Sequence, residues 1–151
     1  LGVYDSKWIL PVAETLKNLG AHKALVFHSN DGLDEISSAD KTLVAELNNG
    51  NISEYEIDPK AFDVYQNNLE DLQINSPSDS LKLVQATFRN DDFLSGKNIT
   101  ALNSAAVIYV SGQTDNFSQA FEIAMNVLES GKAQKKLDEL ISFSRKFDES
   151  T

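Results

Sequence analysis

The first apolar positions of the chain recur at the spacing of a helix. One face of this helix would collect Ile9, Val12, Ala13, Leu16 and Leu19. Ser6 is placed to cap its amino end, and Gly20 is placed to end it. Because proline lacks the backbone N–H that the interior of a helix needs, Pro11 predicts that the helix starts late or kinks there.

A continuous apolar run at residues 24–27 predicts a buried strand over residues 23–28, of the kind that parallel sheets contain. Two runs of alternating apolar and polar residues follow, at 43–48 and 52–57, and Asn49-Gly50 stands between them. Asn-Gly between two alternating runs is a strong hairpin signal. The pattern therefore predicts an antiparallel pair appended to a parallel sheet.

Helical spacing dominates the second half of the chain. Residues 59–77 are polar and irregular, which predicts a surface connection with one helical turn at 69–72. The helices expected after it are one capped by Ser78 or Asp79 that runs to Arg89, one over residues 98–110, one capped by Asp115, and one that follows Gly131. The fold class is therefore α/β: a partial parallel or mixed sheet with an antiparallel hairpin and several flanking helices.

Composition narrows the classes of partner. The 151 residues suffice for one domain, and their net charge of −10 disfavours a nucleic-acid partner, whose phosphates would be repelled. The chain has no cysteine, which excludes disulfides and thiolate chemistry. Its apolar stretches are too short for a membrane span, so we expect no membrane partner and a cytoplasmic location.

An acidic turn carries the candidate chemistry. Asp31, Asp34 and Glu35 surround Gly32 immediately after the predicted buried strand, where open α/β sheets bind ligands. Adjacent carboxylates repel each other, and a hard cation such as Mg²⁺ would relieve them. Acids beside glycine are also common turn and cap residues, so the spacing alone leaves both interpretations open.

Other polar residues offer weaker signals. His28 could act on a substrate or orient a carboxylate, or it could be a structural hydrogen-bonding residue. Ser29 does not form a catalytic pair with it, because neighbouring side chains of a strand point to opposite faces. Asn103 could anchor a helix in the core. The amphipathic pattern that contains Lys132, Lys135 and Lys136 indicates a solvated helix face rather than an anion site.

The segment from His28 to Glu35 resembles one that anthranilate phosphoribosyltransferases carry late in their catalytic domain, although that family usually has glycine where Ser29 stands. Further similar segments occur in the family's order: Leu1-Gly2-Val3-Tyr4, Leu19-Gly20, Tyr55-Glu56-Ile57-Asp58-Pro59, Asn103 to Tyr109 and Ser130-Gly131-Lys132-Ala133. The resemblance covers nearly the whole chain. It implies the α/β catalytic domain that phosphoribosyltransferases share with nucleoside phosphorylases.

The resemblance implies an enzyme of tryptophan biosynthesis that transfers the phosphoribosyl group of phosphoribosyl pyrophosphate to anthranilate. It assigns Asp34 and Glu35 to a Mg²⁺ site, gives Asp31 and Gly32 the role of shaping the turn, and assigns no catalytic residue in this chain. The family's phosphate loop and its anthranilate contacts lie in segments that this sequence lacks. We therefore expect residues 1–151 to be a single carboxyl-terminal unit, without the amino-terminal helical domain and the phosphate-loop half, and inactive alone.

The resemblance implies that the full-length enzyme is a homodimer through the small helical domain. This chain is expected to self-associate through its truncated sheet, because exposed strand edges recruit other chains. Two alternatives stay open. One is a non-catalytic binding or regulatory relative of the same fold, and the other is a fragment of a pyrimidine nucleoside phosphorylase.

Overall fold

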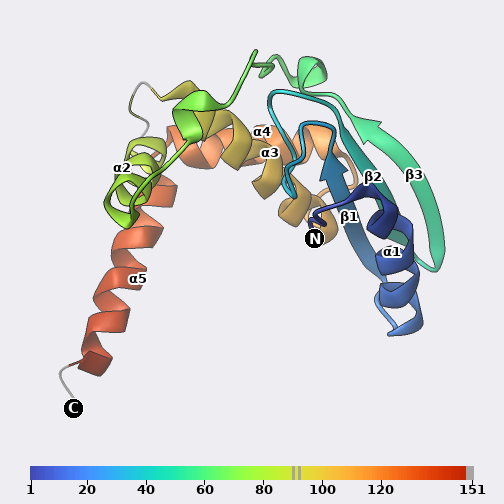
Figure 1. Cartoon of the computed structure of the whole chain (residues 1–151). Helices are drawn as coiled ribbons and strands as arrows, with labels where there is room; N and C mark the ends of the chain where they lie inside the picture. The colour runs from blue at the N-terminus through green and yellow to red at the C-terminus, as the bar shows by residue number, and fades with distance from the viewer. Residues whose placement is uncertain (90, 92, 149–151) are drawn as a thin grey trace.

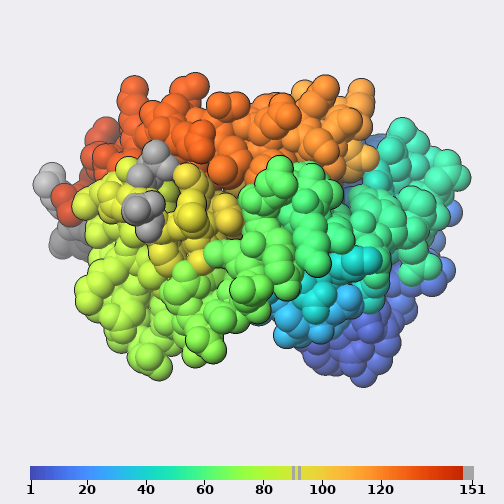
Figure 2. Space-filling view, turned by 90° about the horizontal axis from the view of Figure 1, so that it is seen from above, coloured from blue at the N-terminus to red at the C-terminus, as the bar shows by residue number. Residues whose placement is uncertain are grey.

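The computed structural model describes residues 1–89, 91 and 93–148. In chain order, its elements are α1 (Ile9–Asn18), β1 (Lys23–Ser29), β2 (Thr42–Asn48), β3 (Asn51–Ile57), α2 (Pro77–Phe88), α3 (Leu94–Val110), α4 (Phe117–Glu129) and α5 (Lys132–Asp148). Figure 1 shows the sheet and α1 at one end of the molecule and α2 and α5 at the other, and Figure 2 shows the same separation from above. Within the described part of the chain, no helix combines the length and the apolar composition that a membrane span requires.

The three strands form an antiparallel sheet in the order β1-β2-β3. The hairpin between β2 and β3 is the predicted one. At its turn, Asn49 and Gly50 have φ angles of 49° and 83°. Two successive positive φ angles are what a two-residue hairpin turn of the favoured twist needs, and Asn-Gly adopts them at low cost. The register then pairs Asn48 with Asn51 and Thr42 with Ile57.

The free edge of β1 carries the parallel part of the sheet. Gly2 forms a parallel bridge with Phe27, where Val3 N donates to Phe27 O at 2.9 Å and Phe27 N donates to Leu1 O at 3.1 Å. The α/β class, the hairpin and the flanking helices are thus confirmed. However, β1 itself pairs antiparallel with β2, because residues 30–41 form a loop that returns the chain directly, without the crossover that a parallel pair requires.

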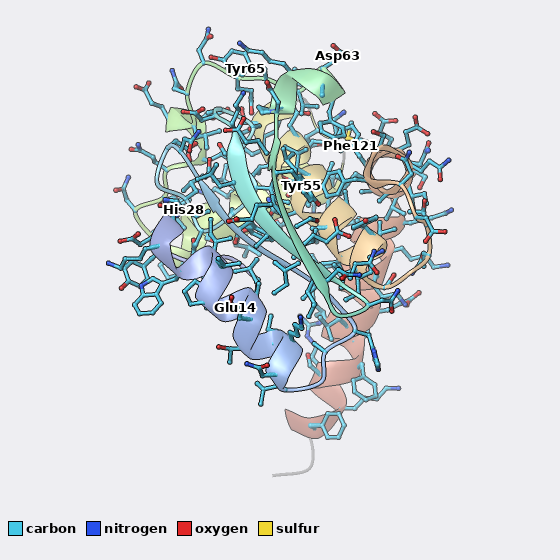
Figure 3. The ribbon with its side chains drawn as sticks, turned by 90° about the vertical axis from the view of Figure 1, so that its right-hand side faces the viewer. Glu14, His28, Tyr55, Asp63, Tyr65 and Phe121 are labelled. Carbon is cyan, nitrogen blue, oxygen red and sulfur yellow. The ribbon has the colours of Figure 1, made fainter. Side chains whose placement is uncertain are left out.

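The sheet is covered on both faces, which explains the continuous apolar run of β1. On one face, α1 packs Ile9 and Ala13 against Val26 and Ala45. The other face lies against α3 and α4 and forms the larger core (Figure 3). Its fully buried members from α3 are Ala101, Leu102 and Ala105, and the two small alanines let the helix approach the sheet closely.

All of the predicted helices are present, but the helix starts differ from the predictions. Asp5, not Ser6, accepts from the backbone N–H of Lys7 and caps a short 3₁₀ turn ahead of α1. The capping residue of α2 is Ser76 rather than Ser78 or Asp79, because Pro77 takes the first helical position, which suits proline. Asn116 rather than Asp115 caps α4. The helical turn predicted at 69–72 is present as Glu70–Leu72.

Candidate functional site

The acidic turn is closed by backbone hydrogen bonds at the carboxyl end of β1. Ser29 N donates to Leu33 O at 2.9 Å, and Gly32 N donates to Ser29 O at 2.9 Å. Gly32 has a φ angle of 94°, which a residue with a side chain rarely adopts. Asn30 N then donates to Lys41 O at 3.0 Å, so both ends of the loop are tied to the sheet.

Asp31 shapes this turn, as expected. One of its carboxylate oxygens accepts from Leu33 N at 3.3 Å, and the other accepts from Ser37 Oγ at 2.5 Å. The Ser37 hydroxyl in turn accepts from Ala39 N at 2.9 Å. The charge of Asp31 is therefore used within the turn, which leaves Asp34 and Glu35 as the carboxylates able to bind a ligand.

Asp34 and Glu35 are both exposed, and neither side chain has a hydrogen-bond or salt-bridge partner among the residues that the structure describes. Partial burial raises the pKa of Glu35, the neighbouring charge of Asp34 raises it further, and the amino group of Leu1 opposes the rise. The described residues contain no group of three potential metal ligands. This arrangement fits Mg²⁺, which is usually held by one or two carboxylates together with water and phosphate oxygens.

An apolar groove opens beside the acid pair. It has a volume of about 660 Å³ and runs between the free edge of β1, Leu1-Gly2 and one side of α3, with Asp34 and Glu35 among its lining residues. A second depression of about 460 Å³ lies between Glu35 and the residues of α3 from Ile99 to Val107. Val107 lines both and is 71% exposed. The acids thus stand beside a largely apolar space of the size that small-molecule sites have.

The backbone of the acid pair is held at two points. A Cβ built on Gly2 would lie 1.5 Å from Asp34 O, so the amino-terminal segment touches the turn where no side chain fits. At the second point, Asn103 of α3 forms two hydrogen bonds with the backbone of Ile36, the residue after Glu35. The sequence indicated only that Asn103 anchors a helix.

His28 and Ser29 take structural positions. His28 Nδ1 lies 2.9 Å from Val3 O, so the imidazole ties the amino-terminal segment to β1. The fully buried Ser29 donates from Oγ to Lys41 O at 3.3 Å. Alternation along β1 separates the two side chains, as expected. On α5, the exposed Lys136 pairs with Glu139 at 2.5 Å, in agreement with a solvated face rather than an anion site.

A buried polar network was missed by the sequence analysis. Glu46 of β2 is only 8% exposed and accepts from Tyr55 Oη at 3.0 Å and from Tyr109 Oη at 2.7 Å (Tyr55 is labelled in Figure 3). The ammonium group of Lys23 donates to Tyr109 O at 2.8 Å and lies 3.6 Å from the centre of the Tyr109 ring. The sequence signal for this network was the position of Glu46, two residues after the apolar Val44 in an alternating run, which puts a charged side chain on the same buried face of the strand.

Comparison with known proteins identifies the family. Residues 1–134 match the model of a family described as glycosyl transferase family, a/b domain. The anthranilate phosphoribosyltransferase of Marinomonas sp. (strain MWYL1) is 43% identical over 148 residues, which are 97% of this chain and 43% of that protein. The enzyme of the same name from Ruthia magnifica is 45% identical over 141 residues, 93% of this chain and 41% of that protein.

Solved structures show the same fold. Anthranilate phosphoribosyltransferase from Thermus thermophilus superposes with a TM-score of 0.86 at 28% identity, over 96% of this chain and 42% of that one. The enzyme from Saccharomyces cerevisiae, solved in complex with PRPP and Mg, gives a TM-score of 0.79 at 19% identity, over 94% of this chain and 41% of that one.

This chain spans less than half the length of these relatives. The match along nearly all of its own length confirms the resemblance inferred from the sequence. The chain therefore belongs to the glycosyl transferase family through its α/β domain, and the relatives that it matches are anthranilate phosphoribosyltransferases.

Proposed function

We propose that this chain is the carboxyl-terminal part of the catalytic domain of an enzyme that transfers the phosphoribosyl group of phosphoribosyl pyrophosphate to anthranilate. The observation that carries the proposal is the acid pair Asp34-Glu35. Neither side chain has a hydrogen-bond or salt-bridge partner among the described residues, and the pair follows β1 beside a groove, in a chain whose relatives carry that enzyme's name. Unpartnered adjacent carboxylates are costly unless a cation relieves them, which supports a metal-binding role over a purely structural one.

In this proposal, Asp34 and Glu35 hold Mg²⁺ near the diphosphate of the substrate. When bound, Mg²⁺ supplies the positive charge that stabilises the departing pyrophosphate. The two side chains must be ionised for this role. No residue of the chain is assigned as a general base, because Nδ1 of His28 is engaged with Val3 O.

The proposal places the remaining parts of the site outside this chain. The phosphate loop, the anthranilate contacts and the helical domain that forms the homodimer belong to the other part of the full-length protein. The complete protein would work in the cytoplasm, in tryptophan biosynthesis. Residues 1–151 alone would then bind neither substrate productively.

An activity assay tests the proposal directly. The full-length protein should convert anthranilate and phosphoribosyl pyrophosphate to phosphoribosyl anthranilate and pyrophosphate, with a requirement for Mg²⁺. Residues 1–151 purified alone should give no turnover above background. Turnover by the isolated chain at a rate near that of the full-length protein would refute the assignment of the missing parts.

The same assay separates the alternatives. A full-length protein that binds phosphoribosyl pyrophosphate but shows no transfer would be the non-catalytic relative. Phosphorolysis of a pyrimidine nucleoside with inorganic phosphate, in place of transfer to anthranilate, would identify a nucleoside phosphorylase. Either result would overturn the proposed transferase activity.

A further inference from the structure

We propose that Asn103 is a positioning residue that fixes the backbone of the acid pair, and thereby the affinity of the site for Mg²⁺. The inference rests on the proposed function, because it concerns the same site. Asn103 does not contact the metal in this account. It acts through Ile36, the residue that follows Glu35.

The oxygen and both N–H groups of the Asn103 carboxamide have hydrogen-bond partners. Its Oδ1 accepts from Ile36 N at 2.9 Å, and its Nδ2 donates to Ile36 O and to Ile99 O, both at 2.9 Å. The two N–H groups and the carbonyl of one side chain are therefore all engaged. A flipped amide would place N–H against N–H and oxygen against oxygen, so the network allows one orientation.

This clamp acts at a point where the backbone has no support from a strand or helix of its own. The Ile36 side chain is fully buried, which brings its peptide groups into the protein, yet Ile36 lies outside the described strands and helices. Buried peptide groups need hydrogen-bond partners. Asn103 satisfies both the N–H and the C=O of Ile36, as a neighbouring strand would, and so fixes the peptide that follows Glu35.

Close packing fixes the backbone of the acid pair at a second point. Gly2 lies so near Asp34 O that a Cβ there would be 1.5 Å from it. The backbone at Asp34 and Glu35 is thus held by both the amino-terminal segment and α3, while both carboxylates stay exposed. Mg²⁺ demands nearly ideal octahedral geometry, so its affinity depends on how well the two carboxylates are held in place.

The helix that carries Asn103 is a rigid support. The neighbouring residues Ala101, Leu102 and Ala105 are fully buried against the sheet and α4. Asn103 also lines the groove and the second depression together with Glu35. Asn103 therefore connects a rigidly packed helix to the acidic turn, as a residue that supports the ligands of a metal site must do.

The test compares Asn103→Ala with Asn98→Ala in the full-length protein. Asn98 lies on the same helix, so its truncation controls for the loss of an asparagine from α3. Hydrogen–deuterium exchange of the segment 31–38 is measured first, without substrate. The second measurement is the Mg²⁺ concentration for half-maximal turnover, together with the KM for anthranilate.

We expect Asn103→Ala to speed exchange of the segment 31–38 by about tenfold or more, with much smaller changes in β1 and in the rest of α3. The Mg²⁺ concentration for half-maximal turnover should rise about tenfold, as for the loss of a residue that orients metal ligands, while the KM for anthranilate stays unchanged. Asn98→Ala should change neither. If Asn103→Ala does not fold, Asn103→Ser, which admits water to the Ile36 peptide, should show the same shifts.

Unchanged exchange of the segment 31–38 would overturn the inference, as would faster exchange with an unaltered Mg²⁺ dependence. A general packing role predicts faster exchange throughout α3 and β1 instead. Failure of the proposed function has a different signature: the wild-type protein would then show no transfer at all. The clamp on Ile36 would in that case be judged by the exchange measurement alone.

Discussion

At the acid pair, the ionised form of Glu35 that a metal site needs lowers the stability of the folded state. Its pKa is raised by partial burial and then by the charge of Asp34, so the folded state disfavours the ionised form that a cation site needs. A carboxyl group with a raised pKa stabilises the fold fully only below its unfolded value, and this contribution is lost as the pH rises through the folded value. At neutral pH without metal, Glu35 is therefore a destabilising residue.

We predict that Glu35→Gln raises the free energy of unfolding at pH 7 by less than about 1 kcal/mol, because the group is mostly exposed and screened. The gain should disappear near and below about pH 4, where the wild-type carboxyl group is also protonated. Urea unfolding at several pH values in the absence of Mg²⁺ measures this. A loss of stability at pH 7 would mean that Glu35 makes a stabilising contact instead.

The helices and strands differ in how well the sequence predicted them. The hairpin was predictable because Asn49-Gly50 meets a backbone requirement that few residue pairs meet. The antiparallel pairing of β1 was not, since it depends on how residues 30–41 return the chain. The start of α3 was predicted at residue 98, whereas the helix begins at Leu94. Gly96 in its first turn is required by packing, because a Cβ there would meet Thr87 and Phe93 at 2.3 Å.

The sequence predicted the residues of the site that stand together in the chain, but not the residues that reach the site through long-range contacts. The acid pair stood out because charged neighbours after a buried strand are visible in the sequence, and Asp31 does shape the turn. The role of Asn103 depends on a contact between residues that lie 67 positions apart in the chain, which no local pattern records. The network of Glu46 likewise joins β2 to α3 across 63 positions.

The Glu46 network supports a prediction at the scale of elements. Tyr109→Phe removes one of the two tyrosine donors to Glu46 and should lower the free energy of unfolding at pH 7 by about 1–3 kcal/mol. Tyr65→Phe is the control, because no hydrogen bond of its exposed hydroxyl is found among the described residues. Chemical denaturation of both variants makes the comparison, and equal stability of the two would contradict a role for the network in fixing α3.

The Tyr109→Phe variant also predicts a pH dependence. Burial, and then the hydrogen bond to Glu46, raise the pKa of Tyr109 from 10.0 to about 12. A raised pKa stabilises the fold below the unfolded value, and the contribution is lost as the pH rises through the folded one. The stability difference between wild type and Tyr109→Phe should therefore shrink as the pH rises from 10.0 towards about 12.

At the scale of the whole molecule, the groove beside β1, of about 660 Å³, is an apolar surface that a partner would cover. Along the outer edge of β1, the amino group of Leu1 donates to Leu25 O at 2.8 Å and Gly2 bridges Phe27, and the apolar side chains of Val107 and Leu1 are 71% and 62% exposed beside it. Exposed apolar surface of this kind recruits other chains. In the proposed full-length enzyme, the rest of the catalytic domain would cover this surface.

We therefore predict that residues 1–151 self-associate at micromolar concentration and that Val107→Lys weakens this association. Leu140→Lys is the control, because Leu140 is 61% exposed but lies on α5, far from the sheet (Figure 1). Sedimentation velocity of the three proteins gives the result. A monomeric wild type would contradict the prediction, and so would an association that Leu140→Lys abolishes while Val107→Lys leaves it intact.

The central claim is that Asp34 and Glu35 bind Mg²⁺ for phosphoribosyl transfer. Its most direct test is the Mg²⁺ dependence of transfer to anthranilate by the full-length protein with Asp34→Ala and Glu35→Ala combined. Glu54→Ala is the control, because it removes an exposed carboxylate from β3. The account predicts that the double variant loses about tenfold or more of its turnover and needs more Mg²⁺, while the control matches the wild type. A double variant that loses thermal stability but keeps the wild-type Mg²⁺ dependence would contradict it.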